Sequence, residues 1–140
     1  NDWVKDKGTW YFMNDKGVMF NQTWLYQGGN WYAFKSSGAM ISADWLYDNG
    51  SWYYLKDSGA MATGWVNYNG TWYYLNNSGS MATGWVKDSG SWYYLKDSGA
   101  MATGWVKDGD QWYYLASYGK MLNNTYTPDG YYVDASGAWK

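Results

Sequence analysis

The sequence of 140 residues contains no cysteine and no histidine. The lack of cysteine excludes a disulfide scaffold and thiol chemistry, and the lack of histidine removes the commonest metal ligand and proton shuttle. All acidic residues are aspartate and all basic residues are lysine, so glutamate and arginine are missing as well. We therefore expect no metal site and no cofactor, and most common catalytic constellations are excluded.

Strong charge and long hydrophobic runs are also missing. The formal net charge is −2 and the lysines are scattered singly, whereas nucleic-acid binding needs a basic stripe and favours arginine. No window approaches the ~18 apolar residues of a membrane span, and no charged segment precedes a short apolar one as in a signal peptide. Nucleic-acid binding and membrane insertion are thus not expected. Because the sequence lacks a starting methionine, we expect a mature segment or a piece of a longer chain.

Aromatic residues are abundant and recur at a fixed period. They make up 24% of the chain, mainly as 13 tryptophans and 17 tyrosines. Two tryptophans seven positions apart return every 20 or 21 residues, and a methionine keeps the same period. Such self-similarity is the signature of a repeat protein. The pairs are Trp3 and Trp10, Trp24 and Trp31, Trp45 and Trp52, Trp65 and Trp72, Trp85 and Trp92, and Trp105 and Trp112.

Each repeat predicts one β-hairpin. Turn dipeptides such as Asn49-Gly50 and Asn69-Gly70 lie between two short runs rich in aromatic and β-branched residues, which is typical of a tight turn with positive φ. A lone hairpin is marginal in water, so each must bury its apolar face against its neighbours. The sequence therefore predicts an all-β fold, a β-solenoid of stacked β-hairpins. Residues 1–140 form a single array of about six full repeats and a partial C-terminal cap, in which Gly130 replaces the second tryptophan and Trp139 replaces the methionine.

Two interpretations compete for the aromatic residues. Alternation along the strands puts one tyrosine and the leucine of each repeat on the face opposite the second tryptophan, and we interpret these as core. The tryptophan pairs exceed what packing requires, and three electron-rich faces around a gap would form a cage for a quaternary ammonium. Sugars also stack on such rings. The residues expected in the core are Tyr53, Tyr73, Tyr93 and Tyr113, with Leu55, Leu75, Leu95 and Leu115.

The unit GWVKDSGSWYYLKDSGAMAT, residues 84–103, resembles the choline-binding repeat of pneumococcal-type cell-surface proteins, a family that includes autolysins and adhesins. The resemblance implies choline held between consecutive hairpins by both tryptophans of one unit and a tyrosine of the next, often beside a methionine. The implied sites are Trp24, Trp31 and Tyr54; Trp45, Trp52 and Tyr74; Trp65, Trp72 and Tyr94; Trp85, Trp92 and Tyr114; and Trp105, Trp112 and Tyr132.

The first pair and the methionines are left open by the sequence. The position that matches the partner of Trp3 and Trp10 is Ala33, so the sequence does not decide whether this pair forms a site. Methionine is a common gap filler, so the methionine series fits packing between hairpins as well as a wall of the cage. Gly130 removes a tryptophan from the last repeat, and no site is expected beyond Trp105 and Trp112.

The resemblance implies a non-catalytic module that binds choline or phosphocholine of teichoic and lipoteichoic acids. Such a module would hold a larger surface protein non-covalently to the bacterial cell wall, outside the cell, and any catalysis would lie in another module. With no arginine available, we expect the phosphate to point to solvent. Self-association into a homodimer is left open, and the alternative function is a glucan or wall-carbohydrate binding repeat. The repeated aspartates stand beside turn residues and are interpreted as turn formers: Asp48, Asp57, Asp88, Asp97 and Asp108.

Overall fold

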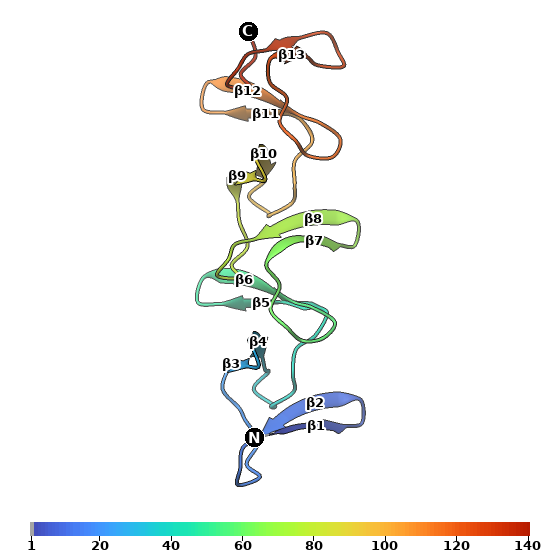
Figure 1. Ribbon diagram of the computed structural model, residues 1–140, viewed down its shortest axis with the longest axis vertical. Helices are drawn as coiled ribbons and strands as arrows, with labels where there is room; N and C mark the ends of the chain where they lie inside the picture. The colour runs from blue at the N-terminus through green and yellow to red at the C-terminus, as the bar shows by residue number, and fades with distance from the viewer. Residues whose placement is uncertain (1) are drawn as a thin grey trace. The chain divides into compact units, whose positions relative to one another are not determined.

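The computed structural model describes residues 2–140, and this part of the chain is all-β, built from seven antiparallel hairpins (Figure 1). We number the hairpins one to seven in chain order. Residues 2–140 include no helix, hence none long and apolar enough to cross a membrane. The strands are β1 (Asp2–Asp6), β2 (Thr9–Met13), β3 (Trp24–Gln27), β4 (Asn30–Ala33), β5 (Asp44–Asp48), β6 (Ser51–Leu55), β7 (Gly64–Tyr68), β8 (Thr71–Leu75), β9 (Gly84–Asp88), β10 (Ser91–Leu95), β11 (Gly104–Asp108), β12 (Gln111–Leu115), β13 (Thr125–Tyr126) and β14 (Tyr132–Val133).

Two-residue turns close the first six hairpins, as the sequence predicts, whereas residues 127–131 connect β13 to β14. Asn49 and Gly50 have φ values of 53° and 87°, and Ser89 and Gly90 have values of 50° and 84°. Two consecutive residues with positive φ match the right-handed twist of the flanking strands, and asparagine and glycine reach this conformation at low cost. The turn sets the register, in which the first tryptophan lies directly across from the second tyrosine, as Trp85 does from Tyr94.

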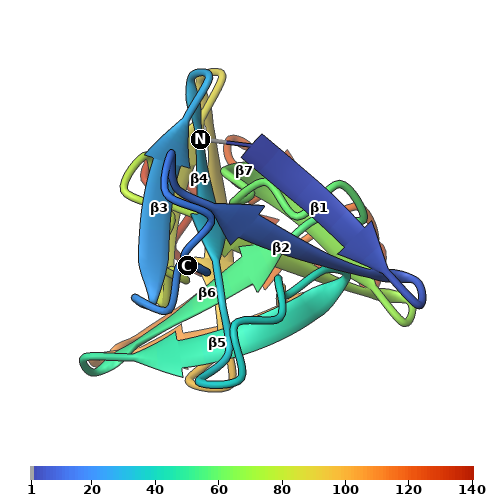
Figure 2. The ribbon, with the colours of Figure 1, turned by 90° about the horizontal axis from the view of Figure 1, so that it is seen from below.

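The chain divides into two compact units. One contains residues 1–64 and 75–81, and the other contains residues 65–74 and 82–140. In the first unit the hairpins β1–β2, β3–β4 and β5–β6 follow one another along the stack (Figure 1) and point outward in three different directions (Figure 2). Stacked hairpins of this kind confirm the predicted fold class, and each unit has the local arrangement of a β-solenoid.

Backbone hydrogen bonds join each hairpin to the loop that follows the next one. The Met61 N–H donates to the carbonyl oxygen of Trp31 at 2.8 Å in the first unit, and the Met101 N–H donates to that of Trp72 at 2.8 Å in the second. The methionine that follows each of hairpins two to six thus sits beside the second tryptophan of the preceding hairpin. This contact carries the stacking from one repeat to the next.

The buried core of each unit is mainly aliphatic. Leu55, Leu75 and Leu95 are fully buried, Leu115 nearly so, and Val133 continues the series in hairpin seven. These leucines confirm the predicted inner face of the strands. The tyrosines assigned to the same face are only half-buried, so the leucines, and not the tyrosines, form the closed part of the core.

Glycines in the turns after hairpins two, three, four, six and seven leave room for methionines. A Cβ atom at Gly79 would lie 2.3 Å from the Met61 sulfur, and one at Gly119 would lie 2.3 Å from the Met101 sulfur. Both glycines also have φ values near 90°, a backbone conformation that residues other than glycine rarely adopt. The methionines therefore pack between hairpins, as one of the two interpretations predicted.

Candidate functional site

The two tryptophans of a hairpin form an open right-angled corner. In hairpin two the ring centroids of Trp24 and Trp31 are 6.5 Å apart with an interplanar angle of 87°. In hairpin five Trp85 and Trp92 are 6.4 Å apart at 88°. The second tryptophan of each pair keeps about 40% of its surface exposed, from 39% at Trp10 to 43% at Trp31. These rings do not plug an interior, because a large share of each one faces solvent.

A tyrosine of the following hairpin supplies the third wall. The ring of Tyr53 lies 5.1 Å from Trp24 and that of Tyr93 lies 4.9 Å from Trp65, both edge to face. The ring of Tyr113 lies 5.1 Å from Trp85. We use the word cage for this space between two tryptophans of one hairpin and the tyrosine of the next.

The structure differs from the sequence-based expectation in the tyrosine that closes each cage. The expected residues Tyr54, Tyr94, Tyr114 and Tyr132 are replaced by their neighbours Tyr53, Tyr93, Tyr113 and Tyr131 in the contacts with the first tryptophan of the preceding hairpin. The tyrosines expected in the cages instead pack on an aromatic ring of their own hairpin. Tyr54 contacts Trp45, Tyr94 contacts Trp85, Tyr114 contacts Trp105 and Tyr132 contacts Tyr126.

The physical reason is the alternation of side chains along a strand. Tyr94 lies across from Trp85, so it shares the face that carries the tryptophans of hairpin five. Tyr93 lies across from Val86 and therefore on the opposite face. Within each unit, consecutive hairpins meet with the tryptophan face of one against the opposite face of the next. This opposite face was predicted to be core. In the structure, the same face also forms the far wall of the cage.

The cage of hairpin four is a pocket of about 350 Å³ lined by aromatic rings and a thioether. Trp65 and Trp72 form the corner, Tyr93 the far wall and Met101 a fourth side, with Ser117 and Tyr118 at the rim. The methionine therefore serves both of the roles that the sequence left open. It packs against the turn glycine of the next repeat and also lines the cage.

The first tryptophan pair also forms a pocket, of about 300 Å³. Trp3 and Trp10 are joined there by Tyr32 and Met40, with Ser58 at the rim. The ring centroids of Trp3 and Tyr32 are 4.9 Å apart. This pair was left open in the prediction because the position matched to the partner tyrosine is Ala33. Tyr32 occupies the same position in its hairpin as Tyr93 does in hairpin five.

The cage of hairpin six is closed by four aromatic rings. Trp105, Trp112, Tyr131 and Trp139 line a pocket of about 350 Å³. The Trp139 N–H donates to the carbonyl oxygen of Trp112 at 2.8 Å, the same bond that a methionine makes in the other repeats. Trp139 therefore takes the place of methionine in space as it does in the sequence, and it completes the cage.

The site expected at Trp45, Trp52 and Tyr74 has its residues in both compact units. Within hairpin three the Trp45 ring packs on Tyr54 at 5.0 Å, and Trp52 packs on Tyr47 at 5.0 Å. Within hairpin four Tyr74 packs on Trp65 at 5.0 Å. The assignment of this site stays a prediction.

Four aspartates hold the first tryptophan of a preceding hairpin by its indole N–H. The Nε1–H groups of Trp24, Trp85 and Trp105 donate to their carboxylates at 3.0 Å, and that of Trp65 does so at 3.1 Å. Three of these residues were predicted only to form turns. Their recurrence 23 or 24 positions after a tryptophan is the signal that could have revealed this contact. The acceptors are Asp48, Asp88, Asp108 and Asp129, in chain order.

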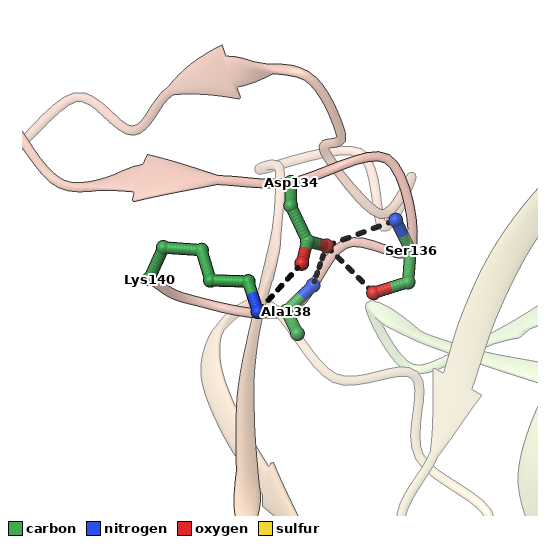
Figure 3. A network of polar contacts seen from close by, with 4 residues as sticks. All are labelled: Asp134, Ser136, Ala138 and Lys140. Atoms are coloured by element: carbon green, nitrogen blue, oxygen red, sulfur yellow. Dashed lines mark hydrogen bonds and ion pairs between the residues drawn. The ribbon is translucent and has the colours of Figure 1, made fainter.

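A polar turn around Asp134 precedes Trp139 in the chain (Figure 3). The Asp134 carboxylate accepts hydrogen bonds from the Ser136 hydroxyl at 2.6 Å and from the backbone N–H groups of Ser136 and Ala138 at 2.9 and 3.0 Å. The Lys140 ammonium lies 3.4 Å away. The Ser136 hydroxyl above all, together with these N–H groups and Lys140, holds the pKa of Asp134 below its ordinary value.

We predict that acid opens the cage of hairpin six through this turn. A carboxyl whose pKa is lowered in the folded state stabilises it above the pKa of the unfolded chain, and this contribution is lost as the pH falls through the lowered pKa. Asp134→Asn should reproduce the acid effect at neutral pH, because the amide cannot satisfy the same three donors and the ammonium. The measurement is the indole ¹H–¹⁵N signal of Trp139, which should move or broaden.

Asp97→Asn is the matched control for this prediction, since Asp97 is an exposed carboxylate in the corresponding turn of hairpin five. The control should leave the Trp139 signal in place. A Trp139 signal that is equally insensitive to Asp134→Asn would show that the turn does not hold the ring.

Comparison with protein-family models identifies the repeats. A model described as a choline-binding repeat matches residues 47–84, 62–103 and 82–126, which together span more than half of the chain. The chain belongs to the choline-binding repeat family. A second model, described as a putative cell wall binding repeat, matches residues 1–19 and 22–40. A search of curated proteins finds no match for this choline-binding repeat protein.

Solved structures support the same assignment for the whole array of choline-binding repeats. Choline-binding protein F from Streptococcus pneumoniae, crystallised in the presence of a peptidoglycan analogue, is 44% identical with a TM-score of 0.87, over 99% of this chain and 46% of that one. CbpJ from Streptococcus pneumoniae TIGR4 is 45% identical with a TM-score of 0.89, over 99% and 47%. The cell wall endolysin from phage Cp-1, complexed with choline, is 41% identical with a TM-score of 0.65, over 96% and 41%.

The choline-binding repeats described here span less than half the length of these relatives. The relatives are thus larger than the array, and they include both choline-binding protein F and an endolysin. The cages lie in the part of the chain that they share with this protein.

Proposed function

We propose that this chain binds choline, one molecule in each cage, without catalysing a reaction on it. The observation that carries the proposal is the repeated corner of two half-exposed indoles closed by a tyrosine of the next hairpin. Aromatic faces attract a quaternary ammonium through their quadrupoles, and such a cation sheds its water more easily than a primary ammonium. The choline bound to the related Cp-1 endolysin supports the same ligand class.

Each cage is expected to be a weak site. Three ring contacts at about 0.5 to 2 kcal/mol each give about 2 to 6 kcal/mol before the cost of association. Single sites then have dissociation constants in the millimolar range by order of magnitude. Several cages on one chain that meet a polymer with many choline groups raise the avidity by about 10² to 10⁴.

The proposed partners are teichoic and lipoteichoic acids that carry phosphocholine, which would place the module outside the cell on the bacterial wall. The family's cell wall binding description and the peptidoglycan analogue present with choline-binding protein F support a wall partner. We propose that residues 1–140 act as one binding array of a larger surface protein.

Titration with choline and, separately, with a glucan oligosaccharide tests the proposal. Choline should change the tryptophan fluorescence and raise the melting temperature. At a concentration ten times its dissociation constant, each site adds about 1.4 kcal/mol to the free energy of unfolding. Trp72→Ala should remove the cage of hairpin four and leave the others, because neighbouring repeat contacts persist.

Tyr126→Ala is the control for Trp72→Ala, since Tyr126 is a 69% exposed ring that packs only against Tyr132 among the aromatic contacts of residues 2–140. It should leave the number of choline sites unchanged. A response to the oligosaccharide alone would show that the cages bind sugar and not choline. No response to either ligand would show that the array has a purely structural role.

A further inference from the structure

The carboxylates at the cages carry an inference that rests on the proposed function and deepens it. Each of Asp48, Asp88 and Asp108 is the last strand residue before a hairpin turn, and Asp129 lies in the turn region of hairpin seven. Each accepts the indole N–H of the first tryptophan in the hairpin before it. One wall of the cage is thus anchored to the next hairpin through a negatively charged group.

We propose that these aspartates are positioning residues that give the cages their preference for a positive charge over a neutral group of the same shape. A hydrogen bond to a carboxylate is stronger than one to a neutral acceptor, and it fixes the orientation of the ring. It also polarises the indole, because hydrogen-bonded groups polarise one another. A more electron-rich ring face attracts a cation more strongly, whereas a neutral trimethyl group gains little from it.

The charges around the cage of hairpin five make the role of Asp108 specific. The Lys87 ammonium lies 5.9 Å from the ring centroid of Trp92, so one ring of this cage already faces a cation. Asp108 supplies the negative group on the other ring, Trp85, at a hydrogen-bond distance of 3.0 Å. Without the carboxylate charge, the positive charge of Lys87 would no longer be opposed by a nearby negative charge, and the attraction for a bound cation would weaken.

The chain also contains a neutral counterpart. Gln27 ends β3 before the turn of hairpin two, at the place that aspartate holds in hairpins three, five and six. The preceding cage, that of Trp3 and Trp10, therefore has a neutral side chain at this position. Lys5 lies 5.7 Å from the Trp10 ring centroid. This cage should discriminate least between a cation and its neutral analogue.

The experiment measures ligand affinity at each cage from the indole ¹H–¹⁵N signals of the full chain. The two probes are choline and 3,3-dimethylbutan-1-ol, in which a carbon atom replaces the quaternary nitrogen. Asp108→Asn keeps an oxygen that can accept the Trp85 N–H but removes the charge, and Asp108→Leu removes both. We expect Asp108→Asn to weaken choline at Trp85 by about threefold to fivefold and to leave the alcohol unchanged. Asp108→Leu should weaken both ligands, because the ring loses its anchor.

Asp110→Asn is the matched control, since it removes the same charge two residues away in the same hairpin. It should leave the ratio of the two affinities at Trp85 unchanged. A second measurement needs no variant: in the wild-type chain the preference for choline over the alcohol should be larger at Trp85 than at Trp3.

The outcomes separate this inference from the proposed function. If the wild-type cages bind no choline, the proposed function is wrong, and the inference is wrong with it. If they bind choline but Asp108→Asn leaves the ratio unchanged, or the ratio at Trp3 equals that at Trp85, only the inference is overturned, and the aspartates are structural anchors.

Discussion

Replacement of Leu95 by alanine is expected to lower the free energy of unfolding by about 2 to 5 kcal/mol, the range for a large buried aliphatic side chain. Leu95 has no exposed surface and belongs to the buried core of the second unit. The loss of its side chain leaves a cavity that the flanking repeats cannot fill by collapse. Denaturant unfolding followed by far-ultraviolet circular dichroism measures the effect.

The control lies in the same strand. Trp92 is 40% exposed and forms a wall of the cage of hairpin five. Although tryptophan is the larger residue, Trp92→Ala should destabilise the fold less than Leu95→Ala and should abolish choline binding at that cage. An equal or greater loss of stability for Trp92→Ala would assign the second tryptophan to the core.

Replacement of Gly119 by alanine should close the cage of hairpin four. The new Cβ would lie 2.3 Å from the Met101 sulfur and 3.1 Å from the ring of Tyr93, and both of these side chains line that cage. The methionine is flexible, so it is expected to move into the pocket. Choline affinity at Trp65 should fall by about tenfold or more, which corresponds to about 1.4 kcal/mol or more of binding free energy. The indole signals of Trp65 and Trp72 report this affinity.

Gly90→Ala is the control that separates the steric clash of the new Cβ with Met101 from the backbone strain of an alanine at positive φ. Gly90 has a φ of 84°, close to the 95° of Gly119, but a Cβ there meets no atom within 4 Å. Both variants should lose about 1 to 3 kcal/mol of stability through an alanine at positive φ. Only Gly119→Ala should affect choline at Trp65. Equal affinities for the two variants would show that Met101 finds another place without entering the cage.

The elements that the sequence predicted well are those that short-range chemistry decides. The Asn49-Gly50 and Ser89-Gly90 pairs predict tight turns because few other residues tolerate two successive positive φ values. The turn then sets the register of the hairpin, and the period of the tryptophans predicts the stack. The fully buried leucines also follow, since a strand of five residues with alternating faces leaves few ways to bury them.

The choice of tyrosine could not be made in the same way. Alternation told which residues share a face with Trp92, but not which face of the next hairpin would meet the tryptophans. The structure brings Tyr113, rather than Tyr114, to Trp85. The same shift explains why Trp3 and Trp10 have a partner in Tyr32 although Ala33 holds the position that the sequence argument examined.

The period, the turns, the tryptophan corners and the family are determined by the sequence itself, because each depends on residues within about one repeat of one another. The closing tyrosine and the carboxylate on the indole were decided only by tertiary structure. Both depend on which face of one hairpin meets the next. This meeting results from the packing of side chains more than twenty residues apart, which local propensity and strand alternation do not decide.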